Sequence, residues 1–249
     1  MNMKKNGFTL VELIIAMALG FLILTAVYAG INMAQRSSAS VGRKVVTQQD
    51  ARAVLDLMAM EIRMASCNPT LSTTIWSTIP TATCNFMGNL IPIAANRGIQ
   101  TAANPANTII IAMDLGGIFN PVTGLNNSPS GIIGDYPNEY IEYSYNGADT
   151  ITRNVSCLGA DQPILGGAGS ATMVRNAAAG VNLFTYFDRS NNDITATVIN
   201  NNSSPTNGVP AIRRIRITIV ADTESKDSLT SNPRRMTYIT DVLVRNHAF

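Results

Sequence analysis

Few residues of this chain could do chemistry, and the most unusual of them is an acid, Glu12, inside an apolar run. The run extends from Phe8 to about Ile31 in the segment KKNGFTLVELIIAMALGFLILTAVYAG. A charged side chain at the centre of a bilayer costs on the order of 2.5–3.5 kcal/mol on insertion scales. A carboxylate kept there indicates a role that Leu or Ile would not serve, such as pairing with a cation.

The cysteines and the single histidine are the other reactive groups. The cysteines Cys67, Cys84 and Cys157 show no C-x-x-C spacing, and His247 is the only histidine, so we expect no metal site and no cofactor. Cys67 and Cys84 enclose a loop of about 16 residues, and a disulfide there would contribute roughly 3 kcal/mol. Pairing of Cys157 with either of the other two, and three free thiols, stay open as alternatives.

No pattern in the chain predicts an enzyme. No nucleophile and base are paired, and LGGAGSA (165–171) lacks the Lys-Ser/Thr and the following apolar helix of a phosphate-binding loop. The segment DRSNND (188–193) carries oxygen groups that could bind calcium, but the same residues are common turn formers, so a hairpin loop is the simpler interpretation.

A cluster of arginines near the C-terminus could form a patch for DNA or an acidic partner. Its members are Arg213, Arg214, Arg216, Arg234 and Arg235. The alternation of Ile215 and Ile217 with Arg214 and Arg216 is typical of a half-buried strand with a solvated face. Since no aromatic residues are interleaved, we expect nucleic acid not to be a partner.

Composition and charge place the body of the chain outside the cytoplasm. Charged residues make up 14% of the 249 residues, below the roughly 25% usual for soluble domains. Lys4 and Lys5 precede the apolar run and should stay cytoplasmic. Removing both lysines with a leader would bring the net charge from +2 to zero, which leaves no general attraction to nucleic acid.

The periodicity predicts one helix of roughly 55 residues over 8–66. Its first part, 8–31, would span about 35 Å, enough to cross a membrane. Its second part, 32–66, is amphipathic, with an apolar stripe. The stripe consists of Val41, Val45, Gln48, Arg52, Leu55, Ala59 and Ile62, broadened by Val54, Leu57, Met58 and Met64. Asn68-Pro69 should end the helix.

The rest of the chain predicts antiparallel strands laid against the second half of the helix, which gives an α+β fold. The expected strands are 108–115, 140–146, 150–155, 181–188, 194–199, 211–222 and 236–246. Asn146-Gly147 signals a hairpin. Residues 66–107 read as irregular loops.

The start of the chain resembles a known class of leader. Gly7 and Phe8 in G-F-T-L-V-E, with Lys4 and Lys5 upstream, resemble the prepilin leader of type IV pilins and type II secretion pseudopilins; an ordinary signal peptide has a shorter apolar run. The resemblance implies cleavage between Gly7 and Phe8 by an inner-membrane prepilin peptidase, N-methylation of Phe8, and a role for Glu12 in assembly. The new amine of Phe8 and the Glu12 carboxylate of a neighbouring helix could then pair, lowering each other's desolvation cost.

A weaker resemblance concerns the subfamily. LDLMAMEIRMA and the ending VLVRN resemble PilW-type minor pilins and J-type pseudopilins, with Glu61 and Ser66 departing from the usual helix-end pattern. The implied organisation is a leader at 1–7, a helix at 8–66 and a β-rich head at 67–249.

The implied function is that of a structural minor pilin that initiates or caps a pilus. Its partners would be prepilin peptidase, other minor and major pilins, the inner-membrane assembly platform and the membrane itself. It would sit in the inner membrane with a periplasmic head, and then in the pilus at the cell surface. The alternatives are a minor pseudopilin of a type II secretion system and, from another class, a membrane-anchored binding protein that never polymerises.

Overall fold

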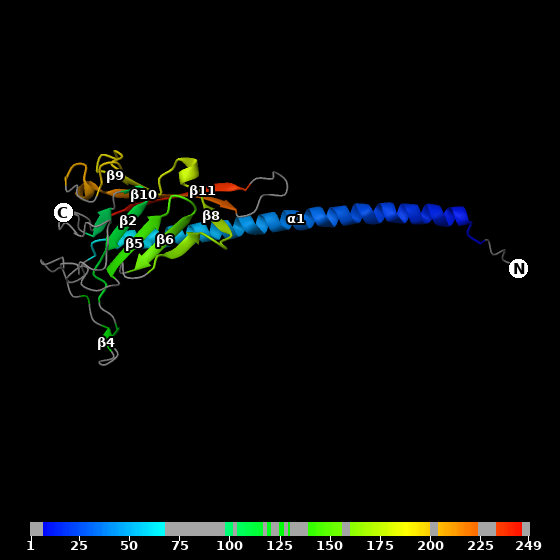
Figure 1. Ribbon diagram of the computed structural model, residues 1–249, viewed down its shortest axis with the longest axis horizontal. Helices are drawn as coiled ribbons and strands as arrows, with labels where there is room; N and C mark the ends of the chain where they lie inside the picture. The colour runs from blue at the N-terminus through cyan, green and yellow to red at the C-terminus, as the bar shows by residue number, and fades with distance from the viewer. Residues whose placement is uncertain are drawn as a thin grey trace.

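The fold is a long helix that projects from a β-rich head. The computed structural model describes residues 7–67, 98–101, 104–116, 119–120, 125–126, 129, 139–155, 160–199, 204–223 and 233–245. Figure 1 shows the N-terminal half of helix α1 extending away from the head, which is gathered around the other end of the helix. The predicted α+β architecture, with antiparallel sheets against a long N-terminal helix, is confirmed.

Helix α1 comprises Leu10–Arg63, 54 residues without a break, which corresponds to about 80 Å of helix. Its first buried residue is Thr47, and its buried face then continues through Ala51, Val54, Leu55, Met58, Ala59, Glu61 and Ile62. The predicted stripe was therefore only partly right. Val41 and Val45 are 59% and 45% exposed, and Arg52 is also exposed, because the head covers the helix only from Thr47 onward.

Five strands form the first antiparallel sheet, in the order β1-β2-β5-β6-β7. Their bounds are Ile99–Thr101 (β1), Thr108–Ala112 (β2), Tyr140–Tyr145 (β5), Thr150–Val155 (β6) and Gln162–Gly166 (β7). The predicted hairpin joins β5 and β6. Asn146 Oδ1 accepts hydrogen bonds from the backbone N–H groups of Ala148, Asp149 and Thr150, and Gly147 has the positive φ that this turn requires.

The second sheet is built on β10, Arg214–Thr223, which pairs with β11, Arg235–Leu243, on one side. On its other side β10 pairs with β8 (Thr172–Val174) at one end and β9 (Phe184–Phe187) at the other. The Asn176 side chain fills the gap between β8 and β9: it donates to the Thr218 carbonyl (2.7 Å) and accepts from the Val220 N–H (2.9 Å). An amide side chain thus replaces a missing strand residue.

Four further short elements lie in the described part of the chain. The strands β3 (Phe119–Asn120) and β4 (Leu125–Asn126) pair with each other. The single-turn 3-10 helices η3 (Ala177–Ala179) and η4 (Val209–Ala211) lie between strands of the second sheet.

Two strand predictions were wrong. The segment 194–199 forms turns, because the Ile194 carbonyl accepts hydrogen bonds from Thr197 N–H (2.9 Å) and Val198 N–H (3.1 Å). Its expected partner, β9, pairs with β10 instead. The stretch 66–107, predicted to be irregular, contains strand β1, whose register on β2 starts at Ile99 opposite Ile111.

One buried core joins the helix to both sheets. Met58 and Ile62 of α1, Tyr143 of the first sheet and Ile217 of the second all belong to it, and all four are fully buried. Gly98 lies where the end of the helix meets β2. At this positive-φ position a Cβ would lie 2.3 Å from the Ser66 backbone nitrogen and 2.7 Å from the Ala112 carbonyl oxygen. The close approach therefore requires glycine.

Candidate functional site

The N-terminal end of α1 holds the residues singled out in the sequence. Gly7, Phe8 and Thr9 precede the helix, and the Phe8 side chain is 89% exposed. Thr9 is the N-cap: its hydroxyl accepts from Glu12 N–H (3.3 Å), and Glu12 Oε2 accepts from Thr9 N–H (3.0 Å) and from the Thr9 hydroxyl (3.0 Å). These contacts form a capping box, so Glu12 has a local role that the sequence reasoning missed although the T-x-x-E spacing signals it.

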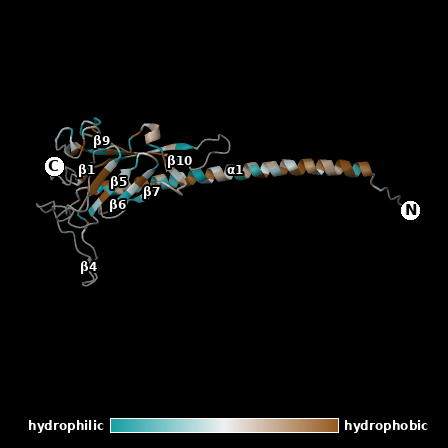
Figure 2. Cartoon of the chain, in the orientation of Figure 1, coloured by the Kyte–Doolittle hydropathy of each residue, from teal (hydrophilic) through white to brown (hydrophobic). Residues whose placement is uncertain are grey.

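The first 37 residues of the helix are not buried by the head, and those up to about Ile31 form an apolar surface. Every residue from Leu10 to Val46 is exposed or only half-buried. Figure 2 shows that the hydrophobic colour is concentrated at the free end of the helix, far from the head. Of the helices in the described ranges, α1 alone is long and apolar enough to cross a membrane, and none of its most apolar window is buried.

Comparison with protein-family models finds one match. Residues 2–28 match the prokaryotic N-terminal methylation motif. The N-terminus is of the prepilin type. This motif supports a type IV pilin-like or pseudopilin protein, a class whose members are processed by prepilin peptidase and are normally structural. No curated protein matches the chain.

The matched segment includes Gly7, Phe8 and Glu12, so the family match and the structural observations concern the same end of the molecule. Gly7 and Phe8 are exposed and outside the helix, where a peptidase has access to the bond that joins them. The cleavage position and the methylated residue remain predictions. So does the role of Glu12 in assembly.

A buried charged network lies at the opposite end of the same helix. Arg153 on β6 contacts Glu61 on the last turn of α1 through two bonds, Nη2 to Oε1 at 2.7 Å and Nε to Oε2 at 3.3 Å. The buried Tyr143 hydroxyl also donates to Glu61 Oε2. Burial, and then the hydrogen bond to Glu61, raise the pKa of the Tyr143 phenol far above its ordinary value. This network attaches the helix to the first sheet, and sequence reasoning did not identify it.

Three arginines of the predicted cluster contact two acids. Asp241 on β11 contacts Arg216 (Nε to Oδ1, 2.9 Å) and Arg214 (Nη1 to Oδ2, 2.9 Å). The Arg216 hydrogen bond holds the pKa of Asp241 below its ordinary value. Arg214 also stacks on the Phe187 ring at 3.8 Å. These contacts favour the interpretation as a strand face over that as a free basic patch.

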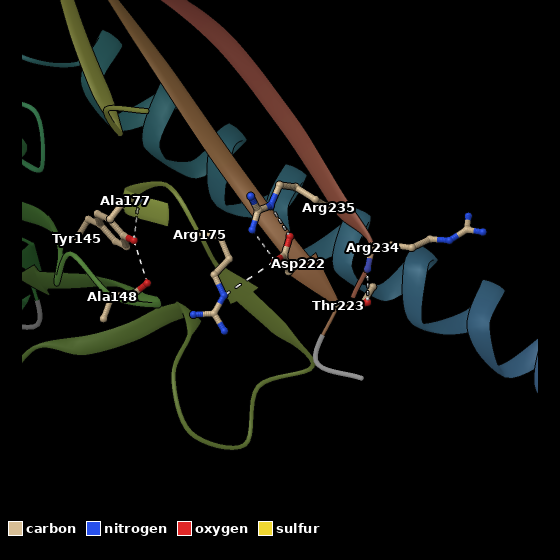
Figure 3. Close-up of polar contacts among 8 residues, drawn as sticks. All are labelled: Tyr145, Ala148, Arg175, Ala177, Asp222, Thr223, Arg234 and Arg235. Atoms are coloured by element: carbon tan, nitrogen blue, oxygen red, sulfur yellow. Dashed lines mark hydrogen bonds and ion pairs between the residues drawn. The ribbon is translucent and has the colours of Figure 1, made fainter. Parts of the chain in front are cut away.

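The second acid is Asp222 on β10. Figure 3 shows Asp222 between Arg235 and Arg175, and Arg235 contacts it through two bonds of 3.0 and 3.1 Å. Asp222 is itself 4% exposed, so this carboxylate belongs to the interior. The same view shows the Tyr145 hydroxyl joining Ala148 to Ala177, a link between the β5–β6 hairpin and η3.

The remaining predicted sites are the cysteines and the loop 188–193. Cys67 is half-buried and forms no disulfide with a described residue. Cys84 and Cys157 lie outside the described residues, so the pairing of Cys67 with Cys84 stays a prediction.

In the loop 188–193, the Asp188 carboxylate accepts hydrogen bonds from Asn192 N–H (2.8 Å) and Asn192 Nδ2 (2.9 Å), which is typical of a turn former. The described residues contain no cluster of three metal-binding side chains.

Proposed function

We propose that this chain is a structural minor pilin of a type IV pilus. The observation that carries the proposal is an apolar helix surface, exposed from Leu10 to about Ile31, directly after a prepilin-type motif. Burial of one Leu, Ile or Phe side chain contributes roughly 1.5–3 kcal/mol. A surface of this length therefore requires lipid around it before assembly and the helices of other subunits afterwards.

Processing would turn this membrane protein into an assembly-competent subunit. Prepilin peptidase would cut between Gly7 and Phe8, and Phe8 would become the N-methylated first residue. The new amine is a cation close to the membrane surface, and Glu12 is an acid one helical turn farther on. Pairing between Phe8 of one subunit and Glu12 of a neighbour would favour assembly, because each charge lowers the desolvation cost of the other.

The remaining parts of the proposal concern place and partners. The subunit would be held in the inner membrane with its head, 67–249, in the periplasm, and would then enter the pilus together with other minor and major pilins. The assembly platform in the inner membrane would receive it. The second candidate is a minor pseudopilin of a type II secretion system, which the same motif supports equally well; neighbouring genes for pilus or secretion components distinguish the two.

Mass spectrometry of the N-terminal peptide of the full chain, isolated from the cell that produces it, tests the proposal. The expected peptide starts at Phe8 and carries one methyl group on its amine. A peptide that retains residues 1–7 with an unmodified start would reject the proposal and favour a membrane-anchored binding protein that never polymerises. Recovery of the processed chain in sheared filament fractions then tests its incorporation.

A further inference from the structure

The outer edge of β11 presents an uninterrupted row of backbone hydrogen-bonding groups. Thr223 N–H donates to the Arg234 carbonyl at 3.2 Å, and Val244 N–H donates to the Arg213 carbonyl at 3.1 Å. Residues alternate between bonding to the neighbouring strand and facing away from it. The backbone groups facing away from β10 therefore belong to Arg235, Thr237, Ile239, Asp241 and Leu243. No strand in the described part of the chain pairs with this side of β11.

The side chains of these five residues combine two exposed apolar groups with two charges of opposite sign. Ile239 is 58% and Leu243 is 59% exposed. The two charges, Arg235 and Asp241, are each matched by a partner on β10, Asp222 and Arg216 respectively. The pairing of β10 with β11 runs over nine residue pairs without a register shift. A long edge with a regular register and exposed apolar side chains is a template for pairing with another strand.

The edges of the first sheet are protected in the ways that natural proteins use. At one edge β1 has three residues. At the other edge β7 contains Pro163, which has no N–H group to donate, and a register shift interrupts its pairing with β6 between Ile151 and Thr152. The outer edge of β11, nine residues long and without proline, has neither of these protections.

We propose that the outer edge of β11 binds an extended segment from a second prepilin-type subunit of different sequence, which adds a further strand to the sheet. The inference rests on the proposed function, because the membrane anchor constrains which partners can reach the edge. Backbone hydrogen bonds would supply the affinity, and apolar side chains at alternate positions of the incoming segment would pack on Ile239 and Leu243.

The direction of β11 argues against an antiparallel pair of two copies. β11 advances alongside α1 in the same direction. Arg235 at its start pairs with Asp222, next to the start of β8, where the Thr172 hydroxyl donates to Asp50 of α1 at 3.1 Å. Asp241 and Leu243, near the end of β11, line a cavity with Arg63. Antiparallel pairing of β11 with the same strand of a second copy would point the two apolar helices in opposite directions. Two such helices cannot insert in one membrane from the same side.

Parallel pairing between two copies is also disfavoured. In a parallel pair, a residue whose backbone groups face the partner strand lies directly opposite a residue whose backbone groups face away. Two-fold symmetry would place each odd-numbered residue of β11 opposite the same residue of the second copy. Both residues would then face the partner, which a parallel pair does not allow. Head-to-tail pairing would require another edge strand of the next copy. In the described residues β1 and β8 have three residues each, β9 has four, and β7 contains Pro163. A different chain meets none of these obstacles.

Photocrosslinking from successive positions of the edge tests the proposal. The photoreactive residue p-benzoylphenylalanine replaces Thr237, Ile239 or Leu243, one at a time, in the full chain within the membranes of the cell that produces it. Crosslinked peptides are sequenced by mass spectrometry. The expected crosslinks reach one other chain that carries a prepilin-type motif. The crosslinked position on that chain should advance by two residues in one direction from position 237 to 239, and by four from 239 to 243, as strand pairing demands.

Edge variants make the test specific to backbone pairing. Thr237→Pro removes an outward N–H and leaves the ladder to β10 intact, so we expect the crosslink yield from position 239 to fall at least about fivefold. The matched control Thr237→Val keeps the N–H and should retain the yield. Because a proline could perturb folding, Ile239→Lys is a second variant, tested with the crosslinker at position 243, where it should also lower the yield. Its control is Ile199→Lys, which adds the same charge at a residue that is 45% exposed and lies outside β11.

Several outcomes would overturn the inference. Crosslinks to a second copy of this chain, to a protein without the motif, or to no protein would do so, as would positions that do not advance in step or yields unaffected by both edge variants. The N-terminal peptide is measured in the same sample. A chain that starts at methylated Phe8 but shows no strand-like crosslinks rejects this inference alone, whereas an unprocessed start rejects the proposed function.

Discussion

The guanidinium of Arg153 and the carboxylate of Glu61, 92 residues apart in the chain, lie 2.7 Å apart where the last turn of α1 meets β6. The side chains are 22% and 6% exposed, so the pair is largely withdrawn from water. Tyr143 donates to the same carboxylate from β5. Because Glu61 follows the long exposed part of the helix, this contact attaches the helix to the head.

Removing the acid from this pair should destabilise the head. Glu61→Ala leaves Arg153 without its carboxylate and the Tyr143 hydroxyl without its acceptor, so we expect the free energy of unfolding to fall by about 3 kcal/mol. Urea denaturation of the full chain in detergent measures it. Asp56→Ala removes an exposed acid from the same helix and should change stability by no more than about 0.5 kcal/mol. Equal effects of the two substitutions would contradict the assignment.

Asn176 should behave as a structural part of the second sheet. Asn176→Ala removes both bonds to β10 and leaves the buried Thr218 carbonyl and Val220 N–H unpaired, so we expect a loss of about 2–3 kcal/mol. Hydrogen exchange at the Val220 amide should accelerate. The control Asn207→Ala alters an exposed asparagine. A stable Asn176→Ala variant with unchanged exchange would show that β8 and β9 hold β10 without this bridge.

Glu142 on β5 should make stability depend on pH. Burial, and then repulsion by Asp161, raise the pKa of Glu142 above 4.5. An acid whose folded pKa is raised opposes folding once ionised, so this penalty is absent well below pH 4.5 and grows as the pH rises through the folded value. Glu142→Gln should therefore raise the thermal midpoint at pH 7.5 and have little effect at pH 3.5.

Asp149 supplies a control of opposite sign for this pH dependence. Its hydrogen bonds with Thr150 and then Asn146 lower the pKa of the Asp149 carboxyl. Its contribution is present above the unfolded pKa and is lost on acidification. Asp149→Asn should therefore lower the thermal midpoint at pH 7.5. If both amide variants shifted the midpoint in the same direction, the electrostatic explanation would be wrong.

The capping role of Glu12 and its proposed charge pairing can be separated by substitution. Glu12→Gln keeps a side chain that can complete the capping box but removes the charge, whereas Thr9→Val removes the N-cap hydroxyl and keeps the charge. If pairing with Phe8 of a neighbour drives assembly, Glu12→Gln should lower incorporation into filaments about tenfold, the equivalent of 1.4 kcal/mol. Thr9→Val should leave incorporation close to that of the native chain.

Immunoblots of sheared filaments, normalised to the membrane-bound chain, measure this incorporation. Leader removal is followed in the same samples by N-terminal mass spectrometry, since Glu12 could act on processing instead. Native-like incorporation of Glu12→Leu would end the pairing hypothesis.

The amino-acid sequence by itself determined the features that depend on local patterns. The apolar run, the period of the helix through Arg63 and the prepilin-type residues around Gly7 and Phe8 are contained within short windows. The strand β10 was equally predictable, because Ile215 and Ile217 alternate with arginines along the sequence. In the structure both isoleucines are fully buried. Each of these features reflects which groups neighbour each other along the chain, and that information is complete in the sequence.

Only the tertiary structure decided which distant groups meet. The segment 194–199 has strand-like residues, but its expected partner β9 pairs with β10, and 194–199 forms turns instead. The buried face of α1 starts at Thr47 because the head reaches no farther along the helix. The partners of Glu61 and Asp241 depend in the same way on how two sheets close around one helix. So does the outer edge of β11, which pairs with no described strand. Such long-range packing selects among many pairings that local propensity leaves nearly equal.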